Sequence, residues 1–377
     1  LFESAWARQP EAQSATLRRE AARAARNGTA AWTAEPMALA LQAKTDRPGS
    51  NQGAREIEIG VVMPLWLPGE RARKAALGDA QIKAVDSRRL AAQLQLAATV
   101  RDAWWTAQRA LAEQGLAHDR LRNAQRLAAD VARRFKAGDM SRADQTQADA
   151  AVAQAEAALA DSTGASNAAQ AALGVWGGSA VAVADNAEPV AELLPEARLP
   201  ESHPALGDWQ DHAEVARRTA DLAAVQSRAN PELTVAATRG REQSGERTSQ
   251  TFTVGVRMPL GDGDRARAKE AGARADALDA ELRVTVERDR LAADVAAAGA
   301  RVKATQSQRD ALARHAALAR DARGFVDKAF RWGEADWPTR LRAELDAVQA
   351  ERQLARARID AAAAISSLRQ AMGLLPQ

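Results

Sequence analysis

Residues 59–73, IGVVMPLWLPGERAR, occur a second time in altered form as VGVRMPLGDGDRAR at residues 254–267. The Met-Pro-Leu tripeptides of the two stretches lie 195 positions apart. A second pair of segments supports the repeat, since RRFKAGDMSRADQTQADAAVAQAE (133–156) aligns with KAFRWGEADWPTRLRAELDAVQAE (328–351) at the same offset. The chain of 377 residues is therefore predicted to contain two copies of one unit.

Composition favours long helices over compact globules. Alanine is abundant, charged residues make up 27%, aromatic residues only 4%, and long segments are rich in Ala, Arg, Glu and Gln. The fold class predicted is mainly α with a small β part. The net charge of +3 does not indicate nucleic-acid binding, because the arginines are interspersed with Asp and Glu and no aromatic residues alternate with them.

Several kinds of site and segment are not expected, because the residues that they need are missing from the sequence. With no cysteine, disulfides and thiolate metal sites are ruled out. No run of 18 apolar residues exists, so no membrane-spanning helix is expected. The chain starts at Leu1 without the charged and apolar segments of a secretion signal, and we expect any such signal to have been removed.

The first repeat is predicted to cover residues 1–173. It begins with a helix over 11–31 and continues with a β-hairpin over 34–64, in which strands at 35–44 and 55–64 alternate apolar and polar residues with a period of two. A helical hairpin over 69–173 follows, turning near Gly138, because proline is absent between Gly69 and Phe135.

The second repeat, residues 204–377, is predicted to use the same order of elements. A helix over 204–229 precedes a β-hairpin over 231–259 and a helical hairpin over 264–373 that turns near Gly333. Glycines and prolines make residues 174–203 an irregular, equatorial connection between the repeats. The duplicated unit is therefore helix–strand–strand–helix–helix.

The strands have the pattern of a membrane barrel. Each has about ten residues, which is long enough for a tilted strand to span a bilayer. The side chains on one face are apolar, and those on the other face are small or polar. Four strands cannot close into a barrel, whereas three copies of the chain would supply twelve. Trp32 and Trp66 flank the first hairpin at the same end, where a membrane interface would hold indole rings.

The order of these motifs resembles the TolC-type outer membrane efflux protein family. The resemblance rests on the duplication, on strands ending in Met-Pro-Leu before a Gly-(Asp/Glu)-Arg-Ala-Arg helix start, and on helical turns with an aromatic residue three positions before glycine. The segments ANPELTV (229–235) and VVMPLWLPGER (61–71) are most similar to the cobalt–zinc–cadmium, heavy-metal resistance branch of this family.

The resemblance implies a homotrimer in the outer membrane of a Gram-negative bacterium. A 12-stranded β-barrel would contact outer membrane lipid and continue as a long α-helical barrel through the periplasm. A periplasmic membrane fusion (adaptor) protein would join this duct to an inner-membrane RND transporter that drives export, here of heavy-metal cations. Alternatives are a duct for drug efflux or protein secretion and, from another class, a soluble periplasmic coiled-coil scaffold with the strands paired as ordinary sheet edges.

The two helical turns, Phe135–Asp139 (first tip) and Phe330–Glu334 (second tip), would be the periplasmic ends that contact the adaptor and narrow the tunnel. Acidic residues there, repeated around a threefold axis, could form a carboxylate ring that favours cations, although acidic residues at helix starts are commonly solvated caps. Arg142 and Arg340 could lock neighbouring helices by ion pairs, or form ordinary surface pairs of little energetic value. The candidate residues are Phe135, Gly138, Asp139, Arg142, Asp144, Phe330, Gly333, Glu334, Asp336 and Arg340.

The sequence departs from the family pattern after the second tip. Trp337, Pro338 and Thr339 replace the usual apolar pair and Asp, so we expect the return helix to begin later or to bend there.

No catalytic or cofactor site is expected. The histidines, His118, His203, His212 and His315, have no chelating partner at i, i+4. The GDGD stretch at 261–264 lacks EF-hand or P-loop spacing and reads as a strand-to-helix turn. No nucleophile, base and orienting group stand together, so the chain is predicted not to be an enzyme.

Overall fold

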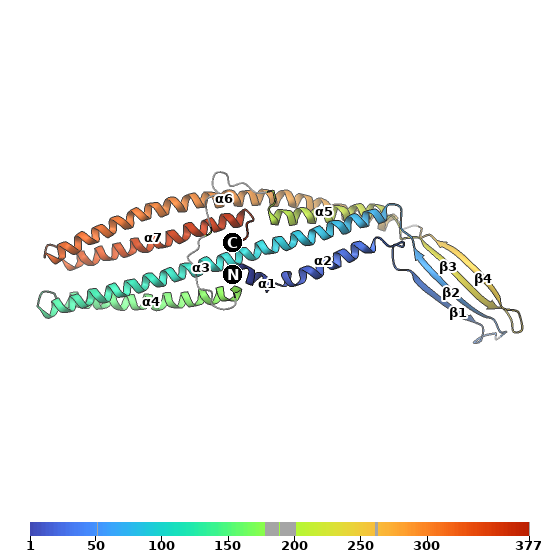
Figure 1. Cartoon of the computed structure of the whole chain (residues 1–377), viewed down its shortest axis with the longest axis horizontal. Coiled ribbons are helices and arrows are strands. Elements are labelled where there is room, and N and C mark those ends of the chain that lie inside the picture. The colour runs from blue at the N-terminus through green and yellow to red at the C-terminus, as the bar shows by residue number, and fades with distance from the viewer. Residues whose placement is uncertain (51, 178–187, 189–200, 261–262, 377) are drawn as a thin grey trace. The chain divides into compact units, whose positions relative to one another are not determined.

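The computed structural model describes residues 1–50, 52–177, 188, 201–260 and 263–376 (Figure 1). Most of the predicted connection 174–203 therefore lies outside the described residues. The elements are α1 (Phe2–Ala7), α2 (Pro10–Gly28), β1 (Ala38–Thr45), β2 (Arg55–Pro64), α3 (Glu70–Lys136), α4 (Arg142–Gly177), α5 (Pro204–Val225), β3 (Glu232–Arg241), β4 (Ser249–Arg257), α6 (Gly263–Arg331) and α7 (Trp337–Ala371).

The chain divides into two compact units, and α3 and α6 run through both. The sheet unit comprises residues 14–90 and 204–288, and the hairpin unit comprises residues 1–13, 91–203 and 289–377. At about 1.5 Å per residue, the 67 residues of α3 extend about 100 Å. No helix in the described part of the chain combines the length and apolar content needed to cross a bilayer.

The sheet unit holds one antiparallel sheet in the order β1-β2-β3-β4. Leu39 pairs with Val61, and Val61 pairs in turn with Val235, so the two hairpins share one continuous ladder. The strands begin and end within a few residues of the predicted hairpins. The mainly α architecture with a small sheet, repeated twice, is the fold class that the sequence predicts.

Helices α2 and α5 contact the start of α3 through ion pairs. Arg26 on α2 lies 2.7 Å from Asp79, and Lys83 lies 2.9 Å from Asp211 on α5. No residue of α2 is buried, whereas α5 buries Leu206 and several alanines. Helix α2 approaches α3 closely at Gly78, where an added Cβ would lie 3.1 Å from the Cα of Arg26.

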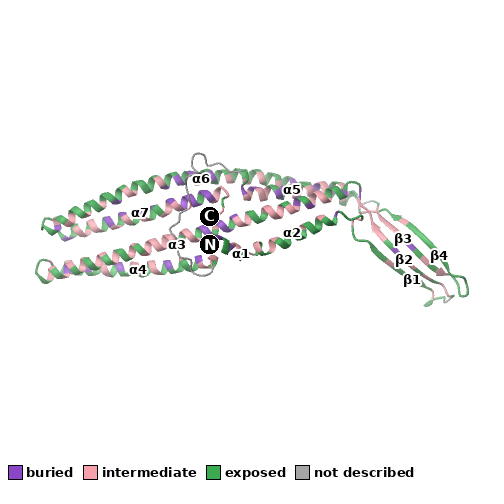
Figure 2. Ribbon diagram, viewed as in Figure 1, coloured by how far each residue is buried: buried purple, intermediate pink, exposed green. Residues whose placement is uncertain are grey.

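The hairpin unit consists of two long helical hairpins. In the second, Val295 and Val302 of α6 pack against Leu368 and other residues of α7, and Ala316 packs against Leu354 nearer the turn. These cores are narrow stripes of Val, Leu and Ala, while most outward residues are exposed or partly exposed (Figure 2). Such narrow stripes are the pattern of coiled-coil packing.

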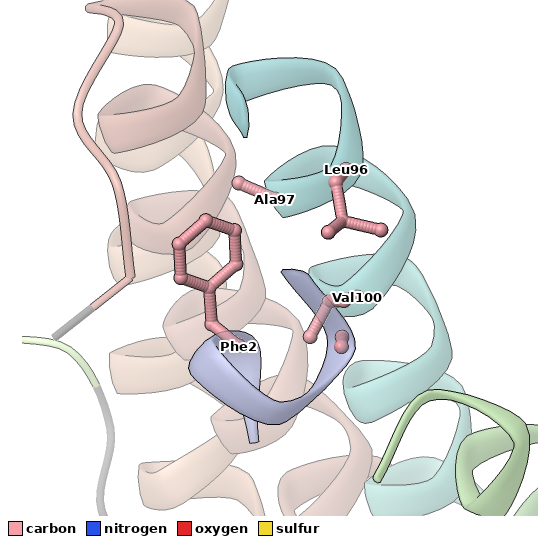
Figure 3. Close-up of a cluster of buried hydrophobic side chains, with 5 residues drawn as sticks. Phe2, Leu96, Ala97 and Val100 are labelled. Carbon is pink, nitrogen blue, oxygen red and sulfur yellow. The ribbon is translucent and has the colours of Figure 1, made fainter. Parts of the chain in front are cut away.

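A short N-terminal helix is the main element that the sequence analysis missed. Helix α1 has six residues, and its Phe2 and Ala5 pack against Leu96, Ala97 and Val100 of α3 (Figure 3). A helix this short is unstable alone and depends on tertiary burial, which no local pattern reveals. The predicted helix 11–31 corresponds to α2.

The expectation of a delayed return helix after the second tip is wrong. Helix α7 begins at Trp337, which is 195 positions after Arg142, the first residue of α4. Asp336 caps the helix by accepting a 2.9 Å hydrogen bond from the Thr339 backbone N–H. Pro338 therefore lies in the first turn, where its missing N–H costs nothing.

Candidate gate and candidate membrane surface

The two tips have the same backbone structure. At the first tip the Gly138 N–H donates to the Phe135 carbonyl and the next N–H donates to the Arg134 carbonyl, at 3.0 and 2.9 Å. The second tip repeats both bonds 195 positions later, at Gly333. Both glycines have positive φ, +85° and +80°, a conformation that side-chain-bearing residues rarely adopt. The duplicated sequence thus produces duplicated helix ends.

Two of the candidate acidic residues cap the return helices. Asp144 accepts hydrogen bonds from the Ser141 backbone N–H and hydroxyl at 3.0 and 2.7 Å, and its own N–H donates to that hydroxyl. At the second tip, hydrogen bonds from the side chain and then the backbone of Thr339 lower the pKa of Asp336. Both carboxylates therefore accept hydrogen bonds that stabilise the N-termini of the return helices.

The other two acidic residues lie in the turns themselves. Asp139 and Glu334 are exposed, and neither forms an ion pair with another described residue. Arg142 is likewise exposed and without an ion pair to any described residue. These three side chains are free to meet groups outside the single chain.

Arg340 joins the two helical hairpins. Its guanidinium lies 3.2 Å from the Asp130 carboxylate on α3 and 2.9 Å from the Asp327 carboxylate on α6. The Arg340 side chain is only 19% exposed, so the pairs are partly shielded from water. Sequence analysis identified Arg340 but not its partners, because an Asp on a polar helix face gives no signal of which helix it meets.

An aromatic cluster lies beneath this arginine. Phe330 is buried and its ring lies 6.2 Å from that of Trp337, tilted by 57°. The guanidinium carbons of Arg134 and Arg340 lie 4.5 and 4.7 Å from the Phe330 ring centroid. Charged and apolar contacts therefore converge at the second tip. Phe135, the counterpart of Phe330, is only partly buried.

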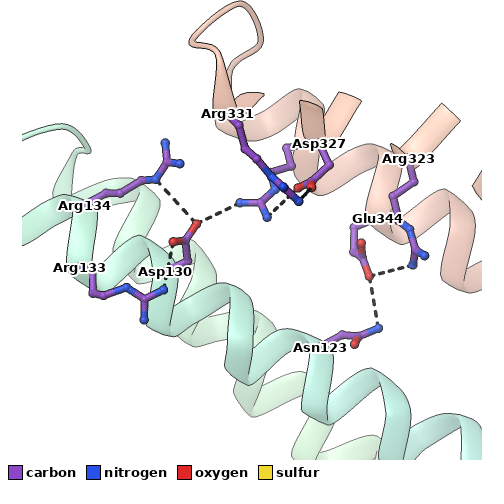
Figure 4. Close-up of polar contacts among 9 residues, drawn as sticks. Asn123, Asp130, Arg133, Arg134, Arg323, Asp327, Arg331 and Glu344 are labelled. Atoms are coloured by element: carbon purple, nitrogen blue, oxygen red, sulfur yellow. Dashed lines mark hydrogen bonds and ion pairs between the residues drawn. The ribbon is translucent and has the colours of Figure 1, made fainter. Parts of the chain in front are cut away.

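Further polar contacts join α3 to the second hairpin above the tips (Figure 4). Glu344 on α7 accepts a hydrogen bond from Asn123 on α3 at 3.3 Å, while Asp130 also pairs with Arg133 and Arg134 of its own helix. Farther along, Arg352 on α7 lies 2.8 Å from Glu113 on α3. The two hairpins are thus joined by a series of ion pairs and hydrogen bonds rather than by one contact.

Trp332 was not identified from the sequence as a functional candidate. It precedes Gly333 in the second tip and is 75% exposed. Tryptophan is enriched at protein interfaces, because its ring is largely apolar while its N–H can still donate to water or to a partner. The signal available was its position, since its counterpart in the first tip is Ala137.

The sheet has two chemically different faces. The register places the large apolar side chains on one face, where Leu41, Ile59 and Phe252 are 67%, 52% and 79% exposed. The other face carries Glu58, whose carboxylate accepts a 3.3 Å hydrogen bond from the Thr238 hydroxyl. Glu56 on the same face lies opposite Lys44. One face suits lipid and the other suits water.

The two predicted interface tryptophans lie at one end of the first hairpin. The Trp66 indole N–H donates to the Ala31 carbonyl at 3.1 Å, and Lys74 lies over the ring at 5.3 Å. Trp32 is 94% exposed. Both positions fit an interface between lipid and water, where an indole ring can be half solvated.

A buried carboxylate fastens the start of α3 to the second repeat. Glu70 is 2% exposed and accepts hydrogen bonds from the side-chain amides of Gln226 and Asn230, each at 2.7 Å, and from the Leu67 N–H at 3.0 Å. Asn230 also donates to the Leu65 carbonyl at 3.0 Å. This cluster holds the strand-to-helix transition in place, and sequence analysis missed it.

No group of three or more His, Asp or Glu side chains in the described part of the chain is arranged to hold a metal ion. His203 is buried, and burial lowers its pKa, which the backbone of Ala371 partly offsets. His212 lies at the surface of α5 beside Asp208.

Comparison with known proteins identifies the fold independently. A family model described as "Outer membrane efflux protein" matches residues 1–178 and 203–374. Among solved structures, VceC from Vibrio cholerae has a TM-score of 0.77 and 18% identity, covering 99% of this chain and 95% of that one. CusC has a TM-score of 0.80 and 17% identity, covering 99% and 91%. The open state of MtrE from Neisseria gonorrhoeae has a TM-score of 0.75 and 17% identity, covering 99% and 88%. No curated protein matches the sequence.

Proposed function

Because the chain belongs to the outer membrane efflux protein family, we propose that it forms the exit duct of a tripartite efflux system for heavy-metal cations. In this proposal three copies assemble in the outer membrane and extend into the periplasm. A periplasmic adaptor joins the duct to an inner-membrane RND transporter. The duct supplies a path and the transporter supplies the energy, so no cofactor is required.

The exposed apolar face of the sheet is the observation that carries this proposal. Side chains such as Leu41, Ile59 and Val254 form a continuous apolar surface that a water-soluble protein would bury. The opposite face is polar, as the lining of a water-filled barrel must be. A soluble coiled-coil scaffold would not need a sheet with one exposed apolar face and one polar face.

Heavy-metal cations are the cargo that the sequence and the polar face favour. The segments ANPELTV and VVMPLWLPGER resemble the heavy-metal branch of the family. On the polar face the carboxylates of Glu56, Glu58 and Glu232 outnumber the cations of Lys44 and Arg257, which favours passage of cations over anions. A drug or a secreted protein as cargo is the alternative that the cargo experiment below distinguishes.

The proposed gate is at the tips. Arg340 would hold the second hairpin against the first through Asp130, and adaptor binding would release that contact. Asp139 and Glu334, which have no ion pair to another described residue, would face the tunnel axis or the adaptor. Trp32 and Trp66 would mark the membrane interface. We further propose that residues 1–173 and 204–377 act as two structural repeats joined by the connection 174–203.

Two measurements test this function. Light scattering corrected for bound detergent should give the mass of three chains, whereas a folded monomer without any need for detergent would contradict the duct. In a Gram-negative strain lacking its own metal-efflux duct, expression with the cognate adaptor and pump should lower cell-associated Co²⁺, Zn²⁺ or Cd²⁺. Unchanged metal content with reduced accumulation of a fluorescent drug would assign the duct to drug efflux instead.

A further inference from the structure

A buried cluster of charged side chains joins α3 to α7 at the end of the hairpin unit far from the tips. Its two cations, Arg101 on α3 and Arg369 on α7, are 6% and 7% exposed. Both lie beside the carboxylate of Glu188, a residue of the connection between the repeats. Burying a guanidinium is costly unless an anion accompanies it. The two arginines therefore make a buried anion site, which Glu188 fills.

Three side chains hold the Glu188 carboxylate. Arg101 donates from Nη2 to Oε1 at 2.8 Å and from Nε to Oε2 at 3.3 Å, so its guanidinium meets both carboxylate oxygens. The hydroxyl of Ser366, itself 2% exposed, donates to Oε2 at 2.7 Å. Nε of Arg369 lies 3.8 Å from Oε1. The planar, two-oxygen shape of a carboxylate matches this arrangement.

We propose that the side chains around Glu188 form a carboxylate-binding site that fixes the register of α7 along α3. Fixing that register brings Arg340 opposite Asp130 at the tips, so Glu188 acts as a positioning residue for a contact that it does not touch. The inference goes beyond the proposed function, because it concerns a single chain and holds whatever the duct carries.

The site is not a product of the duplication. The offset of 195 holds at this end of the helices, since it relates the buried Leu173 of α4 to the buried Leu368 of α7. At that offset the counterparts of Arg101, Ser366 and Arg369 are Ala296, Ala171 and Gly174. None of these three side chains can bind a carboxylate. The charges therefore belong to the place where α3 of the first repeat meets α7 of the second.

Arg101 also binds the C-terminal end of α7 directly. Its Nη1 donates to the side-chain carbonyl of Gln370 at 2.5 Å and to the backbone carbonyl of Leu374 at 2.9 Å. The Gln370 amide in turn donates to the Leu94 carbonyl of α3 at 2.9 Å. A slip of α7 by one helical turn, about 5.4 Å, would break all of these bonds. The cluster thus holds α7 at one axial position.

The cluster and the ion pair at the tips share one register. Asp130 lies 29 positions after Arg101 on α3, and Arg340 lies 29 positions before Arg369 on α7. At 1.5 Å per residue each of these helical segments spans about 44 Å. Because the two segments are equally long, fixing α7 at the cluster places Arg340 level with Asp130.

The contacts between these two points are weaker determinants of the register. Arg109 lies 3.0 Å from Asp360, and Arg352 lies 2.8 Å from Glu113. All four side chains are about one-third exposed or more, so water and salt screen these pairs. The buried cluster is therefore the contact best able to determine which residues of α3 and α7 meet.

Chemical rescue tests the carboxylate site. Glu188→Ala removes a group about the size of acetate, and the purified protein in detergent should melt roughly 5–10 °C lower, because buried guanidiniums lose their anion. Added acetate should restore most of that loss at constant ionic strength, whereas acetamide, its neutral isostere, should not. An unchanged melting temperature, or equal effects of acetate and acetamide, would overturn the site.

A matched control uses an exposed ion pair of the same unit. Glu351 on α7 pairs with Arg320 on α6, and both side chains are partly or largely exposed. Glu351→Ala should change the melting temperature very little and should not respond to acetate. A response to acetate as large as that of Glu188→Ala would show a general salt effect and overturn the rescue.

Pulsed electron paramagnetic resonance tests the register, because a chain without cysteine takes nitroxide labels only at introduced cysteines. Labels at Arg126→Cys on α3 and Arg342→Cys on α7, both exposed positions, report the distance near the tips in chains diluted with unlabelled chains. The distance distribution should be narrow with Glu188 present, broad in Glu188→Ala, and narrow again with acetate. A narrow distribution in Glu188→Ala without acetate would overturn the role in register.

Lys328→Cys with Arg342→Cys supplies the control distance. Both positions lie in the second helical hairpin, which has its own apolar core, so this distribution should not change in Glu188→Ala. Broadening of both distances would show a general loosening rather than a change of register, and would overturn the positioning role.

Glu188→Gln keeps the inference testable if Glu188→Ala does not fold. The amide keeps the volume of the side chain but is neutral, so the protein should melt below wild type and the α3–α7 distribution should broaden. Acetate should have no effect, because the amide already occupies its place. A wild-type melting temperature and a wild-type distribution in Glu188→Gln would show that the site does not require an anion.

Discussion

The Asp130 carboxylate on α3 lies 3.2 Å from the guanidinium of Arg340 on α7, so one ion pair connects the two helical hairpins at their tips. The same guanidinium lies 2.9 Å from Asp327 on α6. A single side chain therefore links three helices. If the duct opens by separating the hairpins at their tips, the contact between this arginine and Asp130 must break.

Arg340→Ala should make the duct easier to open. Partly buried charged hydrogen bonds contribute about 1.5–3 kcal/mol, so losing these should raise the open-to-closed ratio by about tenfold or more. Single-channel recording in planar bilayers would show a higher open probability. Arg142→Ala, which removes an exposed arginine without an ion pair to any described residue, is the matched control. Equal open probability in the two variants would show that Arg340 does not hold the gate closed.

Substituting Trp332 in the second tip and Trp337 at the start of α7 should have different effects. Trp337 is 3% exposed and packs on Phe330, so Trp337→Ala should lower the free energy of unfolding by about 3–5 kcal/mol. Trp332→Ala, at an exposed site, should leave thermal stability nearly unchanged but weaken adaptor binding. Thermal unfolding followed by circular dichroism and a pull-down with the adaptor separate the two effects. Equal stability loss in both variants would contradict this division.

The sequence predicted the fold well because the fold is made of long periodic elements that occur twice. A period of two identified the strands, and the offset of 195 located both tips and their glycines. The start of α7 follows from its N-cap, Asp336, whose side chain accepts a hydrogen bond from the Thr339 N–H. The sequence prediction considered Pro338 without this cap, and it therefore placed the start of the helix too late. Proline is disruptive only beyond the first helical turn.

The contacts of the candidate site were less predictable. Arg340 was identified from its position near a glycine, but Asp130 and Asp327 lie on uniformly polar helix faces. Nothing in a helical period of 3.6 residues tells which polar residue of one helix meets which of another. Glu70 and Asn230 were missed for the same reason, since their contact joins residues separated by 160 positions.

His203 predicts a pH dependence of stability. Burial lowers the pKa of its ring in the folded chain, so the unfolded chain binds a proton more readily. The stability that the neutral ring contributes is complete above the ordinary histidine pKa near 6.5 and is lost as pH falls through the lower folded value. Melting temperatures at pH 7.5 and pH 5.5 should therefore differ more for the wild type than for His203→Gln. An unchanged difference would show that other groups cause the pH effect.

Neighbouring residues of β2 test the two faces of the sheet. Ile59 lies on the apolar face and Glu58 on the polar face. Ile59→Lys should cost about 2–4 kcal/mol near the bilayer midplane, and so reduce assembly into the outer membrane. Glu58→Lys should assemble normally, because its side chain faces water. Heat-modifiable mobility on gels and the amount of protein in purified outer membranes measure assembly. Normal assembly of Ile59→Lys would place that face away from lipid.

The buried cluster around Glu70 allows a test of the transition between sheet and helix, and the repeat supplies its own control. Glu70→Ala leaves the amides of Gln226 and Asn230 without their acceptor, and should lower the free energy of unfolding by about 3 kcal/mol. Asp264, 194 positions later at the start of α6, has a side chain that is 93% exposed and pairs with Arg267. Asp264→Ala should therefore change stability very little. Chemical denaturation in detergent measures both, and a comparable loss at the two positions would mean that the second repeat has a buried partner for Asp264 in the assembled duct.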